Sequence, residues 1–467
     1  MSTYLLKTLG CKANVYDSQR IEKELQDLGW SPDAKNEPKL CIINSCTVTE
    51  EANRQTKKTA SQLARKHPNA CIVITGCAAE VAPTELAKTP GTHFVIGNQD
   101  KNRLVDLVLE KLSLFADDPK KKQGEILGSV IEYQELLSQH PTERIWPFLD
   151  SFKTPAEEGH TKKTRAFLKI QEGCNSFCTY CIIPYARGPS RNPSPQMLVE
   201  QVKSLLEQGI QEVILTGTNI GDYSFHENQK NLEDLIEIIL EKTALPRLRL
   251  SSLDPTEITP KILHLMEENT RLCGHFHVSL QSPHSKILRL MKRRYRFSEV
   301  EHTLQSIANL SKNYPLTGGI FVGMDVITGF PGETDEDFQW TQKALESLPW
   351  TRLHVFPYSE RHQTPASRLP HLVEPKLRMQ RSKILIDMSM QRLTEYYRSI
   401  LHELKTKTLD NVLMERQGVK TWISGYTTNY IRVLVPAYTH KTNELVSVQP
   451  HDFIIDTQKN DVALIAS

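Results

Sequence analysis

The sequence predicts an α/β protein of three successive parts: an N-terminal parallel α/β domain, a central partial (βα)6 barrel of the TIM type, and a small all-β, OB-like barrel at the C-terminus. Strand-like apolar runs alternate with amphipathic helical stretches in residues 1–112 and again in residues 165–402. Residues 403–467 instead hold short β-branched runs between turns, a pattern typical of a small β-barrel. Residues 113–164 show weaker periodicity and are expected to connect the first two parts. At about 150 residues per domain, the length of the chain also predicts about three domains.

The composition indicates a globular protein that does not cross a membrane. Hydrophobic residues make up 39% and charged residues 24% of the 467 residues, and the formal net charge is only +2. No apolar run approaches the roughly 18 residues that span a bilayer. The first residues lack a basic stretch followed by an apolar one, so we expect a cytoplasmic protein whose thiols are reduced. A net charge near zero argues neither for nor against nucleic acid, and any basic surface must be local.

The N-terminal part is expected to alternate strands and helices. The expected strands are residues 4–9, 40–44 and 70–75, and the expected helices are residues 15–28, 50–66 and 83–87. The connector contains the charge run 117–122 and several prolines, and we expect it to include some helix.

The central part contains six strand-like runs separated by helical stretches. These runs are residues 167–171, 212–217, 247–251, 275–280, 319–328 and 352–358. Six βα units predict a partial TIM-type barrel, although an open doubly wound sheet has the same pattern. The expected strands of the C-terminal part are residues 409–415, 420–426, 430–435, 445–448 and 462–465.

Three of the nine cysteines form a C-x3-C-x2-C motif directly after the first expected barrel strand. They are Cys174, Cys178 and Cys181. Barrel active sites form at the carboxyl ends of strands, so the motif lies where catalysis is expected. Structural zinc normally takes four protein ligands, and an iron–sulfur cube usually takes four cysteines. Three cysteines on a cube leave one iron free to bind another molecule; a zinc knuckle is the alternative.

This motif in a six-unit barrel resembles the radical S-adenosylmethionine (radical SAM) superfamily. The resemblance implies a 4Fe–4S cluster whose free iron binds S-adenosylmethionine, and a one-electron cleavage that yields a 5′-deoxyadenosyl radical. The segment Thr216–Asn219 closes the second strand, where the superfamily holds the methionine amino group. The positions that the resemblance marks for cofactor binding are Tyr180, Thr216, Gly217, Asn219, Ser252, Gln281 and Asp325. Taken singly, most of these are equally typical of ordinary strand ends.

A second set of cysteines follows the three expected strands of the N-terminal part. Cys11, Cys46 and Cys77 each come just after a strand, and the carboxyl ends of parallel strands meet at one edge of a sheet. The sequence therefore predicts that these three thiols meet and bind a metal centre. Cys41 and Cys71 lie at strand starts, and with Cys273 they are expected to be buried structural thiols.

These features together resemble the methylthiotransferase family across essentially the whole chain. The resemblance implies a second 4Fe–4S cluster, held by Cys11, Cys46 and Cys77, that supplies or carries sulfur. It also implies that the terminal barrel is a TRAM domain, an OB-like RNA-binding module. Residues 453–467 are less regular than a typical TRAM end, and Gln363 replaces a glycine usual in the family, where a positive φ would strain it.

Short motifs favour the branch that modifies threonylcarbamoyladenosine beside the tRNA anticodon, at position 37. Residues 10–18 and 44–49 look most like that branch, of bacterial type. The branch acting on isopentenyladenosine typically has Gln, not Lys12, after the first cysteine, and remains the closest alternative. A third branch modifies an aspartate of a ribosomal protein and typically has Pro-Lys-Asn there.

RNA binding is expected from clustered cations rather than from net charge. The segment Met291–Arg296 interleaves an aromatic ring with four cations and resembles the family's M-x-R-x-Y motif. A base stacked on an aromatic ring with cations on the phosphates is a common way to hold an RNA loop. The predicted RNA-binding residues are Lys292, Arg293, Arg294 and Tyr295. Other basic runs, such as Lys57-Lys58 or residues 120–122 and 162–165, are equally typical of solvated faces.

The resemblance implies that one S-adenosylmethionine methylates a cluster sulfur, and that the radical formed from a second abstracts hydrogen from C2 of the modified adenine. A methylthio group is then installed. The implied partners are the tRNA anticodon loop and a flavodoxin-like or ferredoxin-like electron donor; the sequence predicts no oligomeric state. Two other readings stay open. A radical SAM enzyme that inserts no sulfur would not need Cys11, Cys46 and Cys77, and an iron–sulfur RNA-binding regulator would cleave no S-adenosylmethionine.

Overall fold

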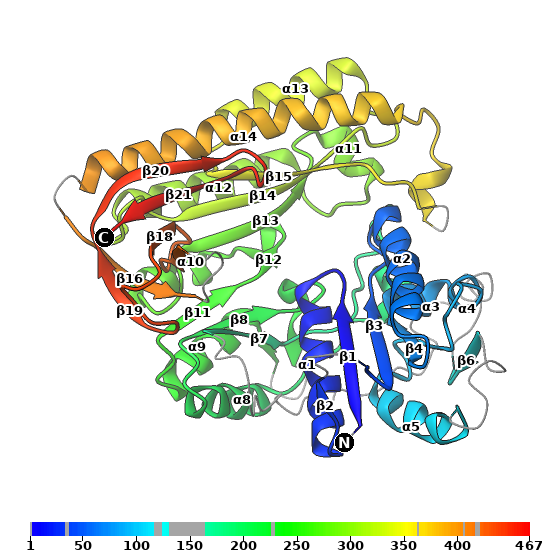
Figure 1. The fold of residues 1–467 in the computed structure, drawn as a ribbon. Coiled ribbons are helices and arrows are strands. Elements are labelled where there is room, and N and C mark those ends of the chain that lie inside the picture. Colours follow the sequence, from blue (N-terminus) through cyan, green and yellow to red (C-terminus); the bar gives the residue numbers. More distant parts are fainter. Residues whose placement is uncertain are drawn as a thin grey trace.

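The three predicted parts are present in the structure, a computed structural model that describes residues 2–32, 37–115, 124–129, 164–225, 229–361, 364–404, 407–415 and 421–467. Figure 1 shows an N-terminal α/β unit, a central curved array of strands and helices, and a C-terminal sheet beside the long helix α14 (Pro375–Leu404). The predicted fold class is confirmed. In the part of the chain that the structure describes, no helix is both long and apolar enough to cross a membrane.

The N-terminal unit is a six-stranded parallel sheet of order β2-β1-β3-β4-β5-β6. Its strands are β1 (Thr3–Thr8), β2 (Ser31–Pro32), β3 (Leu40–Ser45), β4 (Cys71–Gly76), β5 (Phe94–Ile96) and β6 (Glu125–Leu127). Its helices are α1 (Lys12–Asp27), α2 (Glu50–Lys66), α3 (Cys77–Val81), α4 (Pro83–Ala87) and α5 (Leu104–Phe115), with the 3-10 turn η1 (Lys101–Arg103). Strand β6 lies within the expected connector, most of which falls outside the described residues.

Strands β3 and β4 are buried throughout and mostly apolar because both faces of the sheet are covered. Every residue of both strands is buried. Successive residues point to opposite faces, so that Ile42 and Ile43 belong to separate apolar clusters. Helix α2 begins where Thr49 caps it, the Oγ1 accepting a hydrogen bond from the Ala52 amide at 3.2 Å. This packing fixes the carboxyl ends of β1, β3 and β4 side by side.

The central part is a half-barrel of six parallel strand units. Its strands are β7 (Arg165–Lys169), β8 (Glu212–Thr216), β11 (Arg247–Leu250), β12 (Ser252–Leu253), β13 (His275–Gln281), β14 (Phe321–Thr328) and β15 (Arg352–Pro357). Its helices are α7 (Ile183–Arg187), α8 (Pro195–Glu207), α9 (Leu232–Lys242), α10 (Pro260–Glu268), α11 (Ser285–Leu290), α12 (Phe297–Lys312) and α13 (Asp335–Ser347). The small hairpin β9 (Ser224–Phe225) and β10 (Lys230–Asn231) and the 3-10 turns η4 (Ile220–Asp222), η6 (Pro255–Glu257) and η7 (Pro365–Arg368) complete it.

Strands β11 and β12 join the two sheets of the half-barrel. Strand β11 pairs with β8, whereas β12, which follows after Ser251, pairs with β13. The order therefore runs β7-β8-β11/β12-β13-β14-β15, with every pair parallel. Strand β14 begins two residues later than expected, because Gly318 and Gly319 have φ of 76° and 64° and form a turn.

The C-terminal part is a six-stranded sheet of order β19-β16-β17-β18-β21-β20. Its strands are β16 (Leu409–Met414), β17 (Trp422–Tyr426), β18 (Arg432–Pro436), β19 (Leu445–Val448), β20 (Pro450–Asp456) and β21 (Asp461–Ala466). Residues 450–466, part of which is expected to be less regular than a typical TRAM end, form the antiparallel hairpin of β20 and β21. The sequence missed β20 since its outward side chains, Ile454 and Ile455 among them, lack a polar alternation.

A buried group of charges joins the C-terminal sheet to the half-barrel. Glu212, at the start of β8, accepts hydrogen bonds from Arg249 Nε at 2.7 Å and Nη2 at 3.0 Å, and pairs with Arg247 at 2.7 Å. Arg247 in turn donates to the Thr427 carbonyl at 2.9 Å, and the Arg249 guanidinium lies 4.8 Å from the centre of the Tyr430 ring. Arg247 and Arg249 therefore connect the half-barrel to the C-terminal part, and Glu212 binds both of them.

Candidate functional site

The loop that carries Cys174, Cys178 and Cys181 follows β7, as the sequence predicts. The Cys174 amide donates to the Gly188 carbonyl at 3.0 Å, and the Cys181 amide donates to the Cys178 carbonyl at 2.9 Å. Gly173 has φ of 77°, and a Cβ there would collide with the Pro189 carbonyl oxygen. Only glycine fits this position, so the motif depends on Gly173 to turn three thiols toward one region. Cys174 and Cys178 are buried, and Cys181 is half-buried.

Gln171 ties this loop to the segment that closes β8. Its Nε2 donates to the Gly173 carbonyl at 2.6 Å, and its Oε1 accepts from the Thr218 and Asn219 amides, both at 2.9 Å. A Cβ at Gly217 would lie 2.9 Å from the Gln171 carbonyl oxygen, so a larger residue would force the two segments apart. Thr216 is buried beside them. The structure thus brings the predicted methionine-binding segment against the cysteine loop.

The other positions predicted to bind the cofactor border the same strand ends. Asn219 Nδ2 donates to Glu257 Oε1 at 3.1 Å, and burial together with Asp254 raises the pKa of Glu257 to about 7. Ser252 lies half-buried in β12. Gln281 ends β13 with φ of 60°, a strained value for a residue other than glycine.

Tyr180, the remaining predicted position, lies within the cysteine loop. Its ring packs edge-on against that of Phe330, with ring centres 6.2 Å apart.

Arg293 donates a hydrogen bond from Nη1 to Cys178 Sγ at 3.3 Å and pairs through Nη2 with Asp254. The sequence marked Arg293 and Tyr295 for RNA, and for Tyr295 this prediction is wrong. Tyr295 is 3% exposed, with its hydroxyl 2.7 Å from the Ser279 carbonyl, so no base can stack on its ring. Arg293 is committed to the cysteine loop. Lys292 and Arg294 are exposed, and RNA contact by them stays a prediction.

Cys11, Cys46 and Cys77 lie at the carboxyl ends of β1, β3 and β4. A Cβ on Gly10, the neighbour of Cys11, would lie 2.6 Å from Cys46 Sγ, so the first two cysteine positions adjoin. Burial, followed by the charges of Cys77 and Cys11, raises the pKa of the Cys46 thiol to about 11. Cys41, Cys71 and Cys273 are fully buried away from this edge, which confirms that they are buried thiols.

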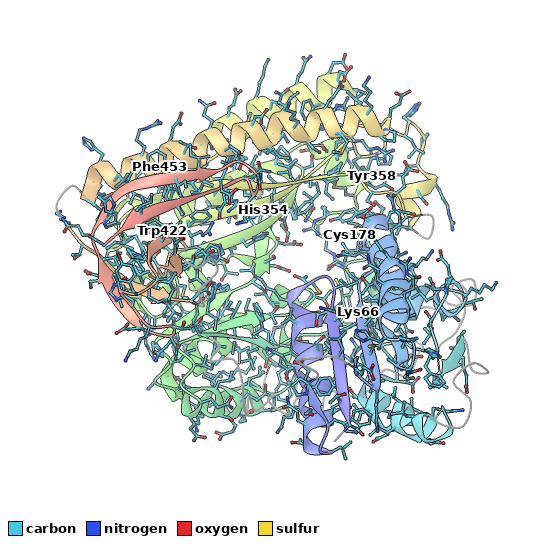
Figure 2. All side chains as sticks on the ribbon, viewed as in Figure 1. Lys66, Cys178, His354, Tyr358, Trp422 and Phe453 are labelled. Carbon is cyan, nitrogen blue, oxygen red and sulfur yellow. The ribbon has the colours of Figure 1, made fainter. Side chains whose placement is uncertain are left out.

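Helix α7 links the two cysteine sets. It begins just after Cys181, and its residues pack against α3, which begins with Cys77. At the end of α7, Arg187 Nε donates to Cys77 Sγ at 3.2 Å. Asn98 Nδ2 also donates to Cys77 Sγ, at 3.6 Å, and to the Ala186 carbonyl at 2.7 Å. In Figure 2, Cys178 appears between the central strand that carries His354 and the N-terminal helix that carries Lys66.

Arg187 belongs to a buried network between the N-terminal and central parts. It pairs with Glu172 and, at 3.3 Å, with Asp17; Lys169 and Lys101 reach Asp17 at 2.6 Å and 2.7 Å. Burial alone would raise the pKa of Asp17, but Lys101, Lys169 and Arg187 outweigh it and hold the pKa well below its usual range. Three cations face two carboxylates, so the network carries one excess positive charge beside Cys77.

These donors fit iron–sulfur clusters. Thiolates are the protein ligands of such clusters, and N–H donors on their sulfurs and nearby positive charge stabilise the bound, anionic form. Each cysteine set has one arginine on a sulfur, and the excess positive charge beside Cys77 suits an anion there. Among the residues that the structure describes, no three His, Cys, Asp or Glu side chains are close enough to hold a single metal ion. A cuboidal cluster bridges thiolates that stand farther apart.

Asp325 lies in the middle of β14, and its Oδ1 is hydrogen-bonded to His277 Nε2 at 2.8 Å. His277 stacks on His354 with ring centres 5.0 Å apart, so three neighbouring strands present these side chains on one face. Burial, with His277 adding repulsion, lowers the pKa of His354 to about 4. Sequence reasoning missed His354 and Arg187. Only the strand register, which no local motif encodes, brings His277 and His354 together.

The comparisons with known proteins agree with this site. Residues 168–345 match the radical SAM superfamily, and residues 3–97 match a family described as uncharacterized protein family UPF0004. The radical S-adenosylmethionine methyltransferase TsrM from Kitasatospora setae has a similar fold, with a TM-score of 0.55 and 16% identity, covering 79% of this chain and 74% of that one. The central part therefore defines a radical SAM protein.

Relatives with assigned names show which family of radical SAM proteins the chain belongs to. The threonylcarbamoyladenosine tRNA methylthiotransferase MtaB of Bacillus subtilis is 32% identical, over 96% of this chain and 94% of its own. A putative methylthiotransferase of Helicobacter pylori is 33% identical over 90% of each chain. The chain belongs to the radical SAM methylthiotransferase family of enzymes. This family uses S-adenosylmethionine and a 4Fe–4S cluster, and methylthiotransferases carry an additional cluster.

Proposed function

We propose that the protein transfers a methylthio group to C2 of N6-threonylcarbamoyladenosine at position 37 of tRNA, and that it uses two iron–sulfur clusters. The observation that carries the proposal is the presence of two cysteine triads joined by α7, in a chain whose MtaB relative matches it over nearly its whole length. A radical SAM enzyme that inserts no sulfur would not need the second triad as a source of sulfur.

The six cysteines are the proposed cluster ligands: Cys11, Cys46, Cys77, Cys174, Cys178 and Cys181. S-adenosylmethionine is proposed to lie against the segment Thr216–Asn219, which Gln171 holds beside the first triad. When bound, the clusters and S-adenosylmethionine supply the one-electron chemistry that an unactivated C–H bond requires, together with the sulfur. The residues of the chain position these groups and exclude water.

Arg293 and Arg187 have matched tasks in this proposal. Each is held by a carboxylate, Asp254 or Glu172, and each directs one N–H at a cysteine sulfur. A guanidinium stays protonated throughout, so it neutralises charge without exchanging protons with the reaction. The proposed electron donor is flavodoxin-like or ferredoxin-like, and the proposed compartment is the cytoplasm, where tRNA is found.

The main rival is methylthiolation of isopentenyladenosine. A tRNA-2-methylthio-N(6)-dimethylallyladenosine synthase of Hydrogenobaculum is 29% identical over 91% of this chain, against 32% for MtaB of Bacillus subtilis. The two substrates differ in charge, because the threonylcarbamoyl group ends in a carboxylate and the dimethylallyl group is neutral. The residues facing the substrate must therefore differ.

Mass spectrometry of nucleosides from total tRNA tests the proposal, with and without the gene. The expected result is loss of methylthiolated threonylcarbamoyladenosine and accumulation of its precursor. Loss of methylthiolated isopentenyladenosine instead would refute the proposed substrate but would agree with the proposed reaction. No change in any tRNA nucleoside would refute both.

A further inference from the structure

Lys12 places a positive charge next to the second cysteine triad and faces the half-barrel. It is the first residue of α1 and directly follows Cys11. The charged groups that act on it belong to the half-barrel: Arg249 on β11, Arg165 on β7, Asp325 on β14 and Glu212 on β8. Lys12 in turn acts on His275 and His354, at the start of β13 and within β15.

The other charges around Lys12 are already matched. Glu212 binds Arg249 and Arg247, Arg165 pairs with Glu415, and Asp325 shares a hydrogen bond with His277. For Lys12, by contrast, no salt bridge or hydrogen bond to another described side chain is found. The cations of this group are Lys12, Arg165, Arg247 and Arg249, and its carboxylates are Glu212, Glu415 and Asp325. By formal count the group has one more cation than carboxylates, and Lys12 is its exposed cation without a paired carboxylate.

We propose that Lys12 binds the carboxylate on the N6 substituent of the target adenosine and so selects the threonylcarbamoyl group over neutral substituents. The inference rests on the proposed function. The base must come close to the second triad for its C2 to receive sulfur, and Cys11 is the covalent neighbour of Lys12. An ammonium with no internal partner gains most from a carboxylate brought by the substrate, and such charge-assisted hydrogen bonds are among the strongest.

The opposite wall suits the base itself. Burial, followed by repulsion from Arg249, holds the pKa of His275 well below its usual range, and the pKa of His354 is also lowered. These rings are therefore neutral near pH 7 and offer no competing charge to the carboxylate. Gly323 adds no side chain beside His354 and His277, since a Cβ there would lie 3.6 Å from His354 Nε2 and 3.8 Å from His277 Nδ1. Lys12, on the facing N-terminal domain, is then the cation without a paired carboxylate that this wall faces, among the described residues.

The test uses the reconstituted enzyme and three synthetic anticodon hairpins. They carry threonylcarbamoyladenosine, its carboxamide analogue of the same shape without the charge, or unmodified adenosine. Dissociation constants come from fluorescence anisotropy, and KM and kcat are measured for the first two hairpins. Iron content and the visible absorbance spectrum of each variant show whether both clusters are loaded.

Wild-type enzyme is expected to prefer the carboxylate to the carboxamide by at least about tenfold. Lys12→Gln should abolish that preference, raise KM far more than it lowers kcat, and keep the iron content. Lys12→Arg should keep most of the preference because it keeps the charge, and Lys39→Gln, at an exposed lysine on the same domain, should change nothing.

Two outcomes would overturn the inference about Lys12 without affecting the proposed function. In the first, the Lys12→Gln enzyme still prefers the carboxylate hairpin. In the second, it loses affinity equally for all three hairpins, which would indicate a phosphate contact. A fourth hairpin, which carries isopentenyladenosine, tests the proposed function separately: that function fails if loaded wild-type enzyme forms no methylthio product on the threonylcarbamoyl hairpin, whether or not it forms one on the fourth.

Discussion

Replacing Glu212 by Gln should destabilise the junction between the half-barrel and the C-terminal sheet. Glu212 is completely buried and accepts hydrogen bonds or ion pairs from Arg249 and Arg247 at 2.7 Å each. Both arginines also hold the carbonyl of Thr427 in the C-terminal part. The substitution keeps the shape of the side chain but leaves the arginines without their central carboxylate.

The pKa of Glu212 gives the size of the effect. Burial would raise this pKa, but Arg249 and Arg247 outweigh it and lower it from 4.5 to about 2. At 1.36 kcal/mol for each pKa unit, the charged form is stabilised by about 3 kcal/mol relative to the unfolded chain. Removal of one partner from a buried ion pair typically costs about 3–5 kcal/mol, which agrees. Because the folded pKa lies below the unfolded one, this stability is present above pH 4.5 and lost as the pH falls toward 2.

Urea unfolding followed by circular dichroism measures the loss, and limited proteolysis reports on the C-terminal sheet. Glu212→Gln should lower the free energy of unfolding by about 3 kcal/mol near neutral pH and flatten its decline between pH 4.5 and 2. Glu267→Gln, at an exposed glutamate on α10, is the matched control and should behave as wild type. A Glu212→Gln protein within about 1 kcal/mol of wild type would refute the reasoning.

Three further predictions concern the cysteine triads. Cys46→Ser should lose about half of the reconstituted iron, whereas Cys41→Ser should keep all of it, because Cys41 lies buried within β3. Arg187→Lys should lower the reduction potential of the second cluster in an EPR-monitored titration, because the Cys77 sulfur loses an N–H donor. Gly173→Ala should lose the iron of the first triad, because its Cβ would collide with a backbone carbonyl.

The controls for these variants come from the chain itself. Gly29→Ala has the same φ of 77° as Gly173 but open space around its Cβ, so it should retain iron and lose only a little stability. Equal iron in the Cys41 and Cys46 variants would contradict the ligand assignment. An unchanged potential in Arg187→Lys would show that the hydrogen bond does not reach the cluster sulfur.

The cysteines could be predicted from sequence because their positions follow from strand topology. Each residue of the set Cys11, Cys46 and Cys77 comes directly after an apolar run, and parallel strands end at one edge. Arg187 could not be predicted, because its contacts with Asp17 and Cys77 join segments that lie 170 and 110 residues apart. Local sequence contains no record of such pairing.

Tyr295 shows the opposite error, in which a local pattern was misleading. An aromatic ring among cations is typical of an RNA-binding surface, but Tyr295 points inward and packs with the barrel core. Lys292, Arg294 and Arg296 are exposed, whereas Tyr295 is held inward by hydrogen bonds from its hydroxyl to the Ser279 and Leu280 carbonyls. Gln363 lies outside the described residues, so its expected strain stays a prediction.

The buried charges beside Cys77 tie the firmness of an interface to the occupancy of a site. The interface between the N-terminal and central parts contains one more positive than negative charge, and uncompensated buried charge weakens the packing of two surfaces. An anionic cluster bound beside Cys77 would balance this charge. We therefore expect limited proteolysis to cut near α7 more slowly in the reconstituted protein than in protein prepared without iron.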